Sequence, residues 1–193
     1  MTLILASKSA SRQAMLRDAG VDFRVEPAHI DERGLEAQML EAAPAVIALA
    51  LAEAKALAGA TGDELVLGSD SLVVVEGRRF DKPANRAEAK AHLNFFSGKT
   101  MELHSAAAIA RGGKAVWSVA DVARLQVRCL SDAFIQEYLD AEWPAVAGCV
   151  GVFRIEARGV HLFEQIEGSH FTVLGMPLLP VLAALRELGE LPS

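Results

Sequence analysis

The sequence predicts an α/β protein built on a mixed β-sheet. Apolar runs of strand length, such as Val66–Val75, alternate along the chain with segments whose apolar residues recur at helical spacing, such as residues 44–58. Two further strand-like segments, 100–111 and 114–128, are separated only by Gly112–Gly113, which is typical of an antiparallel hairpin. An alternating pattern with one antiparallel pair favours a mixed sheet over an all-parallel one.

The strands are expected where apolar runs are bounded by turn residues. The first is the short buried run LIL near the N-terminus, and the longest single run is followed by the turn EGRR. The pattern predicts strands over residues 3–6, 21–26, 65–76, 100–111, 114–128 and 159–166.

The helices are delimited by capping residues and by glycine. Serine caps helix N-termini, proline is favoured in the first turn, and glycine is common just after the last turn. Ser9 and Ser131 are N-cap candidates, and Pro44 opens the longest helix. These signals predict helices over residues 10–19, 44–58, 85–96 and 131–141, and a last helix that starts at Pro177 or Pro180 and stops at Gly189.

The composition is that of a globular chain of 193 residues, and a single domain over 1–193 is expected. Hydrophobic residues make up 52% of the chain and charged residues 23%, which excludes an intrinsically disordered protein. The formal net charge of −6 disfavours broad binding to nucleic acid or to a membrane surface. A local basic pocket can still bind an anion.

The targeting signals of exported and membrane proteins are not expected here. The longest apolar candidate for a membrane span, 44–57, is interrupted by Glu53 and Lys55. The N-terminus has no basic segment before its apolar residues, as a secretory signal would. Cys129 and Cys149 do not make a disulfide framework and are expected in the core. These features predict a cytoplasmic protein.

The first candidate site is the turn ASKSASR, residues 6–12. A helix N-terminus after a strand presents free N–H groups and a positive dipole end, which suit an anion. The turn has no glycine, and the hydroxyls of Ser7, Ser9 and Ser11 replace a close backbone approach, with Arg12 in the first helical turn. An ordinary capped helix with a solvated arginine is the alternative.

Two further stretches offer charged groups. Asp31 and Glu32 follow a predicted strand, where adjacent carboxylates are either solvated or hard oxygen ligands for Mg²⁺. Lys55 continues the apolar face that Ile47 and Leu51 begin. Its ammonium therefore either reaches water or points into a cleft toward an anion.

Asp70 stands in the middle of the apolar run VLGSDSLVVV. An ionised carboxylate in a dry core is costly unless it is paired or hydrogen-bonded. Lys82 lies just beyond the turn that follows this strand and can return toward the same end of the sheet. The two residues form either a structural ion pair, or a base or metal ligand beside a phosphate-binding cation.

The stretch CVGVFRIEARG, residues 149–159, places Glu156 among apolar residues. A carboxylate on a pocket wall can accept two N–H donors from the edge of guanine. A solvated hairpin is the alternative for this stretch.

The common nucleotide and metal motifs are absent from the sequence. It contains no P-loop, no G-x-G-x-x-G, no paired-cysteine zinc pattern and no G-x-S-x-G elbow. What remains is a set of three cations, Arg12, Lys55 and Lys82, with the carboxylates Glu32 and Asp70. This set suits metal-assisted attack on a phosphate ester or anhydride.

Taken together, these stretches resemble the Maf nucleotide pyrophosphatases along almost the whole chain. LILASKSASR is similar to the family's opening LILAS-x-S-P-R-R, and further short motifs follow in the family's order and spacing. These motifs are DE at Asp31–Glu32, AEAKA around Lys55, GSD at Gly68–Asp70, KP at Lys82–Pro83, SGKT at Ser97–Thr100 and LFEQIEGSHFTVLGMPLLPVLAAL at Leu162–Leu185.

The resemblance implies an ITPase-like α/β fold, with a mixed sheet flanked by helices and two lobes around a central cleft, often in a homodimer. It implies hydrolysis of a nucleoside triphosphate to the monophosphate and pyrophosphate with a divalent cation, usually Mg²⁺. Asp70 would be the general base, with metal ligation as its other role, and Glu32 would help to hold the metal. The triphosphate would be bound by Ser7, Ser9, Arg12, Lys55 and Lys82.

Three positions bear on the choice of nucleotide within the family. The late loop with Glu156 is closer to C-A-G-S-F-K-S-E-G of the 7-methyl-GTP branch than to K-A-G-A-Y-G-I-Q-G of the dTTP and UTP branch. Ser71 stands where the first branch has glutamine and the second threonine, and Ser11 replaces the usual arginine, or the tryptophan of the 7-methyl-GTP branch. The resemblance therefore implies 7-methyl-GTP as substrate, with dTTP and UTP as the alternative.

A different class of function is a binding protein that acts without turnover, since the family is also named for inhibiting septum formation when overproduced. The full set of cations and carboxylates argues for catalysis, because a binding module has no evident need of it. A nucleic-acid-binding module is disfavoured by the net charge.

Overall fold

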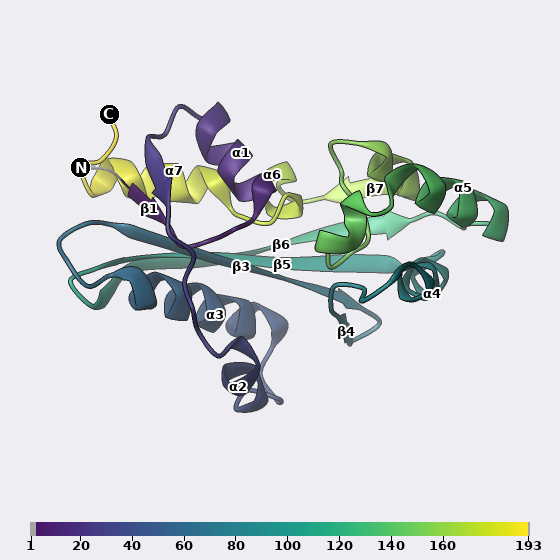
Figure 1. Cartoon of the computed structure of the whole chain (residues 1–193), viewed down its shortest axis with the longest axis horizontal. Helices are drawn as coiled ribbons and strands as arrows, with labels where there is room; N and C mark the ends of the chain where they lie inside the picture. The colour runs from purple at the N-terminus through teal and green to yellow at the C-terminus, as the bar shows by residue number, and fades with distance from the viewer. Residues whose placement is uncertain (1–2, 193) are drawn as a thin grey trace. The chain divides into compact units, whose positions relative to one another are not determined.

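A seven-stranded mixed sheet runs through the structure, a computed structural model that describes residues 3–192 (Figure 1). The strands are β1 (Leu3–Leu5), β2 (Phe23–Val25), β3 (Val66–Val75), β4 (Arg78–Phe80), β5 (Thr100–Arg111), β6 (Lys114–Val127) and β7 (Phe163–Glu167). Their order is β2-β1-β3-β5-β6-β7, and β4 pairs with β3. β1 is parallel to β2 and β3, whereas β4 and β7 are antiparallel to β3 and β6. The predicted mixed α/β class is confirmed.

The helices begin where the capping residues indicated. The side chains of Ser9, Asn85 and Ser131 each accept a hydrogen bond from the backbone N–H three residues further on. None of the helices within residues 3–192 is long and apolar enough to cross a membrane. The α-helices are α1 (Ala10–Asp18), α2 (Glu32–Ala37), α3 (Pro44–Gly59), α4 (Arg86–Phe96), α5 (Asp132–Glu142), α6 (His170–Val173) and α7 (Leu178–Glu187), with 3₁₀ turns η1 (Ala145–Gly148) and η2 (Arg158–Leu162).

The chain divides into two compact units, and the divisions fall inside β3, β5 and β6. The first unit takes the described residues up to Ser71, His104–Val122 and those from Ser169 onward. The second unit takes Leu72–Leu103 and Ala123–Gly168.

In the first unit, α3 covers one face of the sheet, and α1, α6 and α7 cover the other (Figure 1). A hydrophobic core lies under α1 and α7, where Leu5 and Leu67 of the sheet pack with Leu16 and Val181 of these helices. Side chains alternate along a strand. Consequently, neighbouring residues of β3 point to opposite faces of the sheet. The polar residues of its short central stretch therefore lie in two different environments.

Helix α3 lies against β3 at a distance that only glycine permits. A Cβ atom on Gly68 would lie 2.1 Å from the carbonyl oxygen of Ala52 and 2.5 Å from the backbone nitrogen of Ala56. Ala48, Ala52 and Ala56 are fully buried on the facing side of the helix. Small residues on both elements therefore fix how closely the helix approaches the strand.

The second unit holds an aromatic cluster built on β4 and α4. The Phe80 ring packs edge-on against Phe96 and His92, with ring centroids 4.7 and 5.1 Å apart. Burial lowers the pKa of His92. The guanidinium of Arg78 lies over the Phe80 ring, and the ammonium of Lys99 over Phe95. The segment EGRR, predicted only as a turn, thus also supplies a strand.

The local structure differs from the sequence-based expectations in three places. The expected strand over 159–166 begins only at Phe163, because the chain turns through η2, where a Cβ on Gly159 would lie 2.4 Å from the Arg154 carbonyl oxygen. The late loop is not a solvated hairpin, since Val152 and Phe153 are buried. The short helices α2 and α6 were not predicted, because six and four residues are too few to show a helical period.

The cysteines also differ from the prediction of two core residues. Cys129 is exposed and Cys149 is half-buried. Burial raises the pKa of the Cys149 thiol, and the carboxylate of Glu156 adds to the effect.

Replacing Gly68 by alanine tests the close approach of α3 to β3. The new Cβ would overlap the backbone of α3, so the helix must move. We expect the free energy of unfolding to fall by about 3 kcal/mol, which is at the high end of the cost of overpacking. Urea unfolding measures the change.

Gly62→Ala is the matched control, because a Cβ there meets no atom within 4 Å and the residue is exposed. Its effect on stability should stay within about 0.5 kcal/mol. Equal stability of the two variants would mean that α3 adapts to the strand, contrary to the packing described.

Candidate active site

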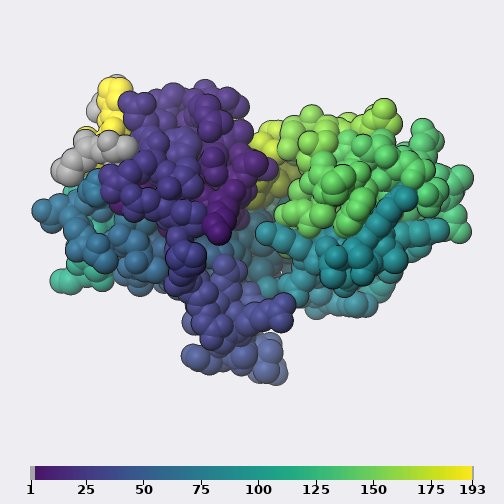
Figure 2. All heavy atoms as spheres, viewed as in Figure 1, coloured from purple at the N-terminus to yellow at the C-terminus, as the bar shows by residue number. Residues whose placement is uncertain are grey.

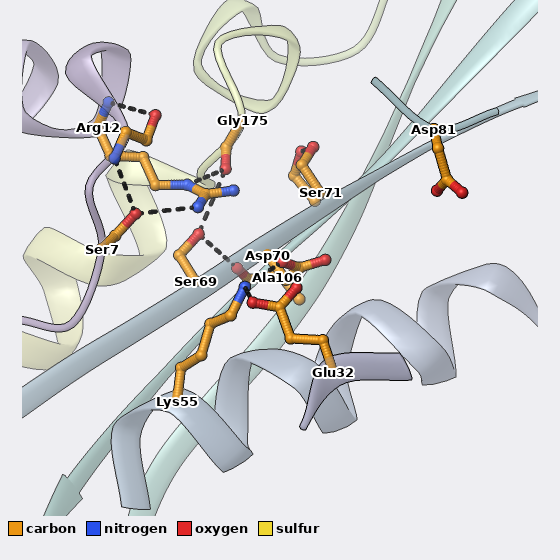
Figure 3. Close-up of polar contacts among 12 residues, drawn as sticks. Ser7, Arg12, Glu32, Lys55, Ser69, Asp70, Ser71, Asp81, Ala106 and Gly175 are labelled. Atoms are coloured by element: carbon orange, nitrogen blue, oxygen red, sulfur yellow. Dashed lines mark hydrogen bonds and ion pairs between the residues drawn. The ribbon is translucent and has the colours of Figure 1, made fainter. Parts of the chain in front are cut away.

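Three charged residues meet on the α3 side of β3 in the first unit (Figure 3). The Lys55 ammonium donates a hydrogen bond to Asp70, with 2.6 Å between Nζ and Oδ1. The same nitrogen lies 3.1 Å from Oε1 of Glu32. The Lys55 and Asp70 side chains are about one-tenth exposed, whereas that of Glu32 is about half exposed. One cation thus serves two carboxylates.

The secondary structure explains why these residues meet. Asp70 is held on a strand that is buried along almost its whole length. Lys55 precedes Ala56, which rests on Gly68, so the packing of α3 brings the lysine beside the strand. Glu32 is the first residue of α2, which has no buried residues and projects from the first unit in Figure 2.

The adjacent carboxylates of Asp31 and Glu32 have separate roles. Asp31 caps α2, since its Oδ1 accepts a hydrogen bond of 2.9 Å from the backbone N–H of Gly34. Glu32 is left to face Lys55. Asp31 thus has a structural role as a cap, whereas the carboxylate of Glu32 faces a cation.

A second group of polar side chains surrounds Arg12 (Figure 3). The buried guanidinium donates from Nε to the carbonyl oxygen of Gly175 at 2.9 Å and from Nη1 to Ser7 Oγ at 3.2 Å. Ser7 Oγ also accepts from the backbone N–H of Ser9. Burial lowers the pKa of Arg12, and the negative charges of Asp70 and Glu32 partly oppose this. The arginine is therefore a buried cation rather than a solvated one.

The serines on either side of Asp70 make hydrogen bonds on the opposite face of β3. Ser69 donates to the carbonyl oxygen of Ala106 at 2.7 Å and to that of Gly175 at 3.3 Å. Ser71 shares a hydrogen bond of 2.6 Å with Ser105, whose hydroxyl also donates to the Thr172 carbonyl. These contacts tie β3 to β5 and to the segment around α6.

The carboxylates suit a divalent cation such as Mg²⁺. Oxygens of Asp70 and Glu32 already converge on one positive charge, and hard oxygen donors are the ligands that this ion prefers. Among residues 3–192 no cluster of three or more acidic, histidine or cysteine side chains is placed to hold a metal. A two-carboxylate site still fits Mg²⁺, because it commonly takes one or two carboxylates together with substrate phosphates.

Comparison with known proteins identifies the family. A family model described as Maf-like protein matches residues 2–188. The chain belongs to the Maf family. This agrees with the resemblance noted in the short motifs, and the match extends over nearly the whole chain.

Individual Maf relatives are close to this chain over their full length. A protein of Rhodopseudomonas palustris strain BisB18, named nucleoside triphosphate pyrophosphatase, is 46% identical over 187 residues, which cover 96% of this chain and 93% of its own. A protein of Rhizobium meliloti strain 1021, named 7-methyl-GTP pyrophosphatase, is 45% identical over 196 residues, which cover 99% and 98%. A nucleoside triphosphate pyrophosphatase of Sphingopyxis alaskensis is 44% identical, with both chains fully covered.

The structure brings together most of the residues that the sequence singled out in this Maf chain. Ser7, Ser9 and Arg12 form one connected group, and Glu32, Lys55 and Asp70 form the other. The cation that pairs with Asp70 is Lys55, and not Lys82 as the turn after the strand indicated. Lys82 and Glu156 are exposed residues of the second unit, and Ser11 is half-buried on α1.

Sequence reasoning missed three residues that shape the site. Gly68 allows α3 to approach, Ser69 is hydrogen-bonded beside Asp70, and the Gly175 carbonyl accepts a hydrogen bond from Arg12. The signal for the first two was the alternation within GSDS, where glycine and aspartate share one face and the serines the other. The Gly175 contact spans 163 positions and left no local signal.

Replacing Arg12 by methionine tests the cost of its burial. We expect Arg12→Met to raise the free energy of unfolding by about 1 kcal/mol, because a desolvated charge is removed. Neither acceptor is orphaned, since Ser7 still accepts from Ser9 and Gly175 from Ser69. Urea unfolding of the two proteins measures the change.

Arg17→Met on the same helix is the control, because Arg17 is exposed. We expect its stability to change by less than about 0.5 kcal/mol. A clear loss of stability in Arg12→Met would show instead that the hydrogen bonds of Arg12 outweigh its desolvation.

Proposed function

We propose that this Maf protein hydrolyses 7-methyl-GTP to the nucleoside monophosphate and pyrophosphate. The coarser activity, nucleoside triphosphate pyrophosphatase, is supported by the family match and by relatives of 44–46% identity that carry this name or that of 7-methyl-GTP pyrophosphatase. The observation that carries the proposal is the meeting of Asp70 and Glu32 around Lys55 in the unit that also holds the buried cation of Arg12.

In this proposal Asp70 is the general base. It takes a proton from a water molecule whose oxygen attacks the α-phosphorus, the bond to the bridging oxygen breaks, and pyrophosphate leaves. A strand holds such a base more rigidly than a loop, and the hydroxyls of Ser69 and Ser71 anchor the strand on both sides of it.

Mg²⁺, when bound, would neutralise phosphate charge and polarise the reacting phosphorus. Glu32 and Asp70 are the residues that would hold it. The carboxylates have no third acidic partner among the described residues, which favours a site completed by phosphate oxygens.

The triphosphate is bound in this proposal by cations and hydroxyls. Arg12 offers the remaining donors of a guanidinium whose Nε and Nη1 are already fixed by Gly175 and Ser7. Such a pre-oriented fork loses little entropy on binding phosphate. Ser9 lies at the N-terminus of α1, Lys55 has a flexible side chain, and Lys82 adds a further positive charge.

The choice of 7-methyl-GTP rests on Glu156 and on one relative. A carboxylate accepts hydrogen bonds from N1–H and N2–H₂ of guanine and pairs poorly with the carbonyl oxygens of a pyrimidine. The Rhizobium meliloti relative named for this substrate is 45% identical. Ser11 and Ser71 are proposed as further positions that influence the preference, since both depart from the 7-methyl-GTP branch.

The assembly and location of the protein are part of the proposal. The homodimer rests on the family resemblance, and the cytoplasmic location on the two cysteines, Cys129 and Cys149, which are free thiols. Size-exclusion chromatography with light scattering measures the oligomeric state directly.

Asp70→Asn tests the catalytic role. We expect pyrophosphate release with Mg²⁺ to fall by at least about 100-fold, the usual contribution of a positioned general base. Asp63→Asn, which changes an exposed aspartate in the loop before β3, should keep wild-type turnover. Inactivity of the folded wild-type protein on every nucleotide would favour the alternative of a non-catalytic binding protein.

A panel of nucleotides tests which nucleobase the enzyme prefers. We expect 7-methyl-GTP to exceed GTP, dTTP and UTP by at least about tenfold in kcat/KM, equivalent to about 1.4 kcal/mol. Glu156→Gln, which introduces the residue of the dTTP and UTP branch, should remove this preference. Fastest hydrolysis of dTTP and UTP by the wild type would contradict the reading of Glu156 while leaving the pyrophosphatase activity intact.

A further inference from the structure

We infer that Lys55 keeps the carboxylate pair closed to divalent cations until a triphosphate draws its ammonium away. The inference rests on the proposed function, because it concerns how that same site is loaded. It gives the Lys55 ammonium two partners in turn, first the carboxylates and then the phosphates. Metal binding and nucleotide binding would consequently depend on each other.

The ammonium of Lys55 occupies both carboxylates that would hold a metal. Lys55 Nζ lies 2.6 Å from Asp70 Oδ1 and 3.1 Å from Glu32 Oε1. A divalent cation held by Asp70 and Glu32 would bind the carboxylates that Lys55 now contacts. The ammonium and such a cation would therefore compete for the same two side chains.

The charges lead to the same conclusion. With Lys55 in place, the three side chains sum to one negative charge, and a metal that joined them would meet a cation at close range. With Lys55 removed, two negative charges face the metal. The Asp70 and Lys55 side chains are only about one-tenth exposed, so solvent screens their interaction weakly.

The backbone under Lys55 is fixed, but its side chain is not. Ala52 and Ala56 on either side are fully buried against Gly68, which holds this turn of α3 in place. The lysine has a four-carbon stem and makes no described polar contact other than those with the two carboxylates. It can therefore rotate toward a phosphate without moving the helix.

An incoming triphosphate supplies the alternative partner. Phosphate oxygens compete with Asp70 and Glu32 for the ammonium, and once it has moved, the carboxylates become free to bind a metal. The coupling is reciprocal by thermodynamic necessity: if nucleotide tightens metal binding by a factor, metal tightens nucleotide binding by the same factor.

Binding of Mn²⁺ to the nucleotide-free protein provides the test. Mn²⁺ accepts the same oxygen ligands as Mg²⁺, and electron paramagnetic resonance measures its free concentration. We expect Lys55→Met to bind Mn²⁺ at least about tenfold more tightly than the wild type, within the usual range of site coupling. Lys114→Met is the matched control, because Lys114 is an exposed lysine at the start of β6, and it should bind Mn²⁺ as the wild type does.

Two further variants distinguish competition by charge from a change of shape. Lys55→Arg keeps the charge and should remain near the wild-type affinity, whereas Lys55→Gln should follow Lys55→Met and replaces it if that variant does not fold. Adding Glu32→Gln to Lys55→Met should remove the gain. Unchanged or weaker Mn²⁺ binding in the folded neutral variants, or a gain that survives Glu32→Gln, would overturn the inference.

The coupling is measured with a nucleoside triphosphate whose α–β bridging oxygen is a methylene group. The analogue should tighten Mn²⁺ binding in the wild type by a larger factor than in Lys55→Met, because phosphate ligands are added in both but the ammonium leaves only in the wild type. An equal factor would overturn the inference. The Mn²⁺ measurements need no turnover, so their outcome is separate from that of the pyrophosphatase assays.

Discussion

The close contact between α3 and β3 at Gly68 is the constraint on which the candidate site depends. No side chain fits between the helix backbone and the strand, so the two elements have one relative position and little freedom to slide. That position sets the distance between Lys55 and Asp70, which belong to different elements. Chemistry at this site therefore rests on a packing contact made by residues that carry no reactive group.

The two faces of β3 have different roles: one carries the charged residue, and the other carries the hydroxyls that anchor the strand. Toward α3 it presents Asp70, where a charge is needed. Toward α1 and α6 it presents Ser69 and Ser71, whose hydroxyls hold the strand to its neighbours. A carboxylate is thus kept in a mostly apolar strand at a tolerable cost, because one face supplies a cation and the other supplies rigidity.

The features of the fold that could be predicted from the sequence are those that local interactions determine. Helix starts at Ser9 and Ser131 follow from capping, and the mixed sheet follows from the order of apolar runs. The pairing of Lys55 with Asp70 did not follow, because it depends on the depth at which a helix packs, and Lys82 was the nearer cation along the turn. Short helices such as α2 have no period to detect and are held by a cap at Asp31.

The bond from Arg12 to Gly175 has a consequence for how the protein is made. It joins residues 163 positions apart, so a ribosome must deliver nearly the whole chain before the arginine has its partner. Contacts of such long range are slow to form, because much chain entropy is lost first. A nascent chain can form α1 early, but Arg12 stays unorganised until the C-terminal segment emerges, and a truncated protein would lack this part of the candidate site.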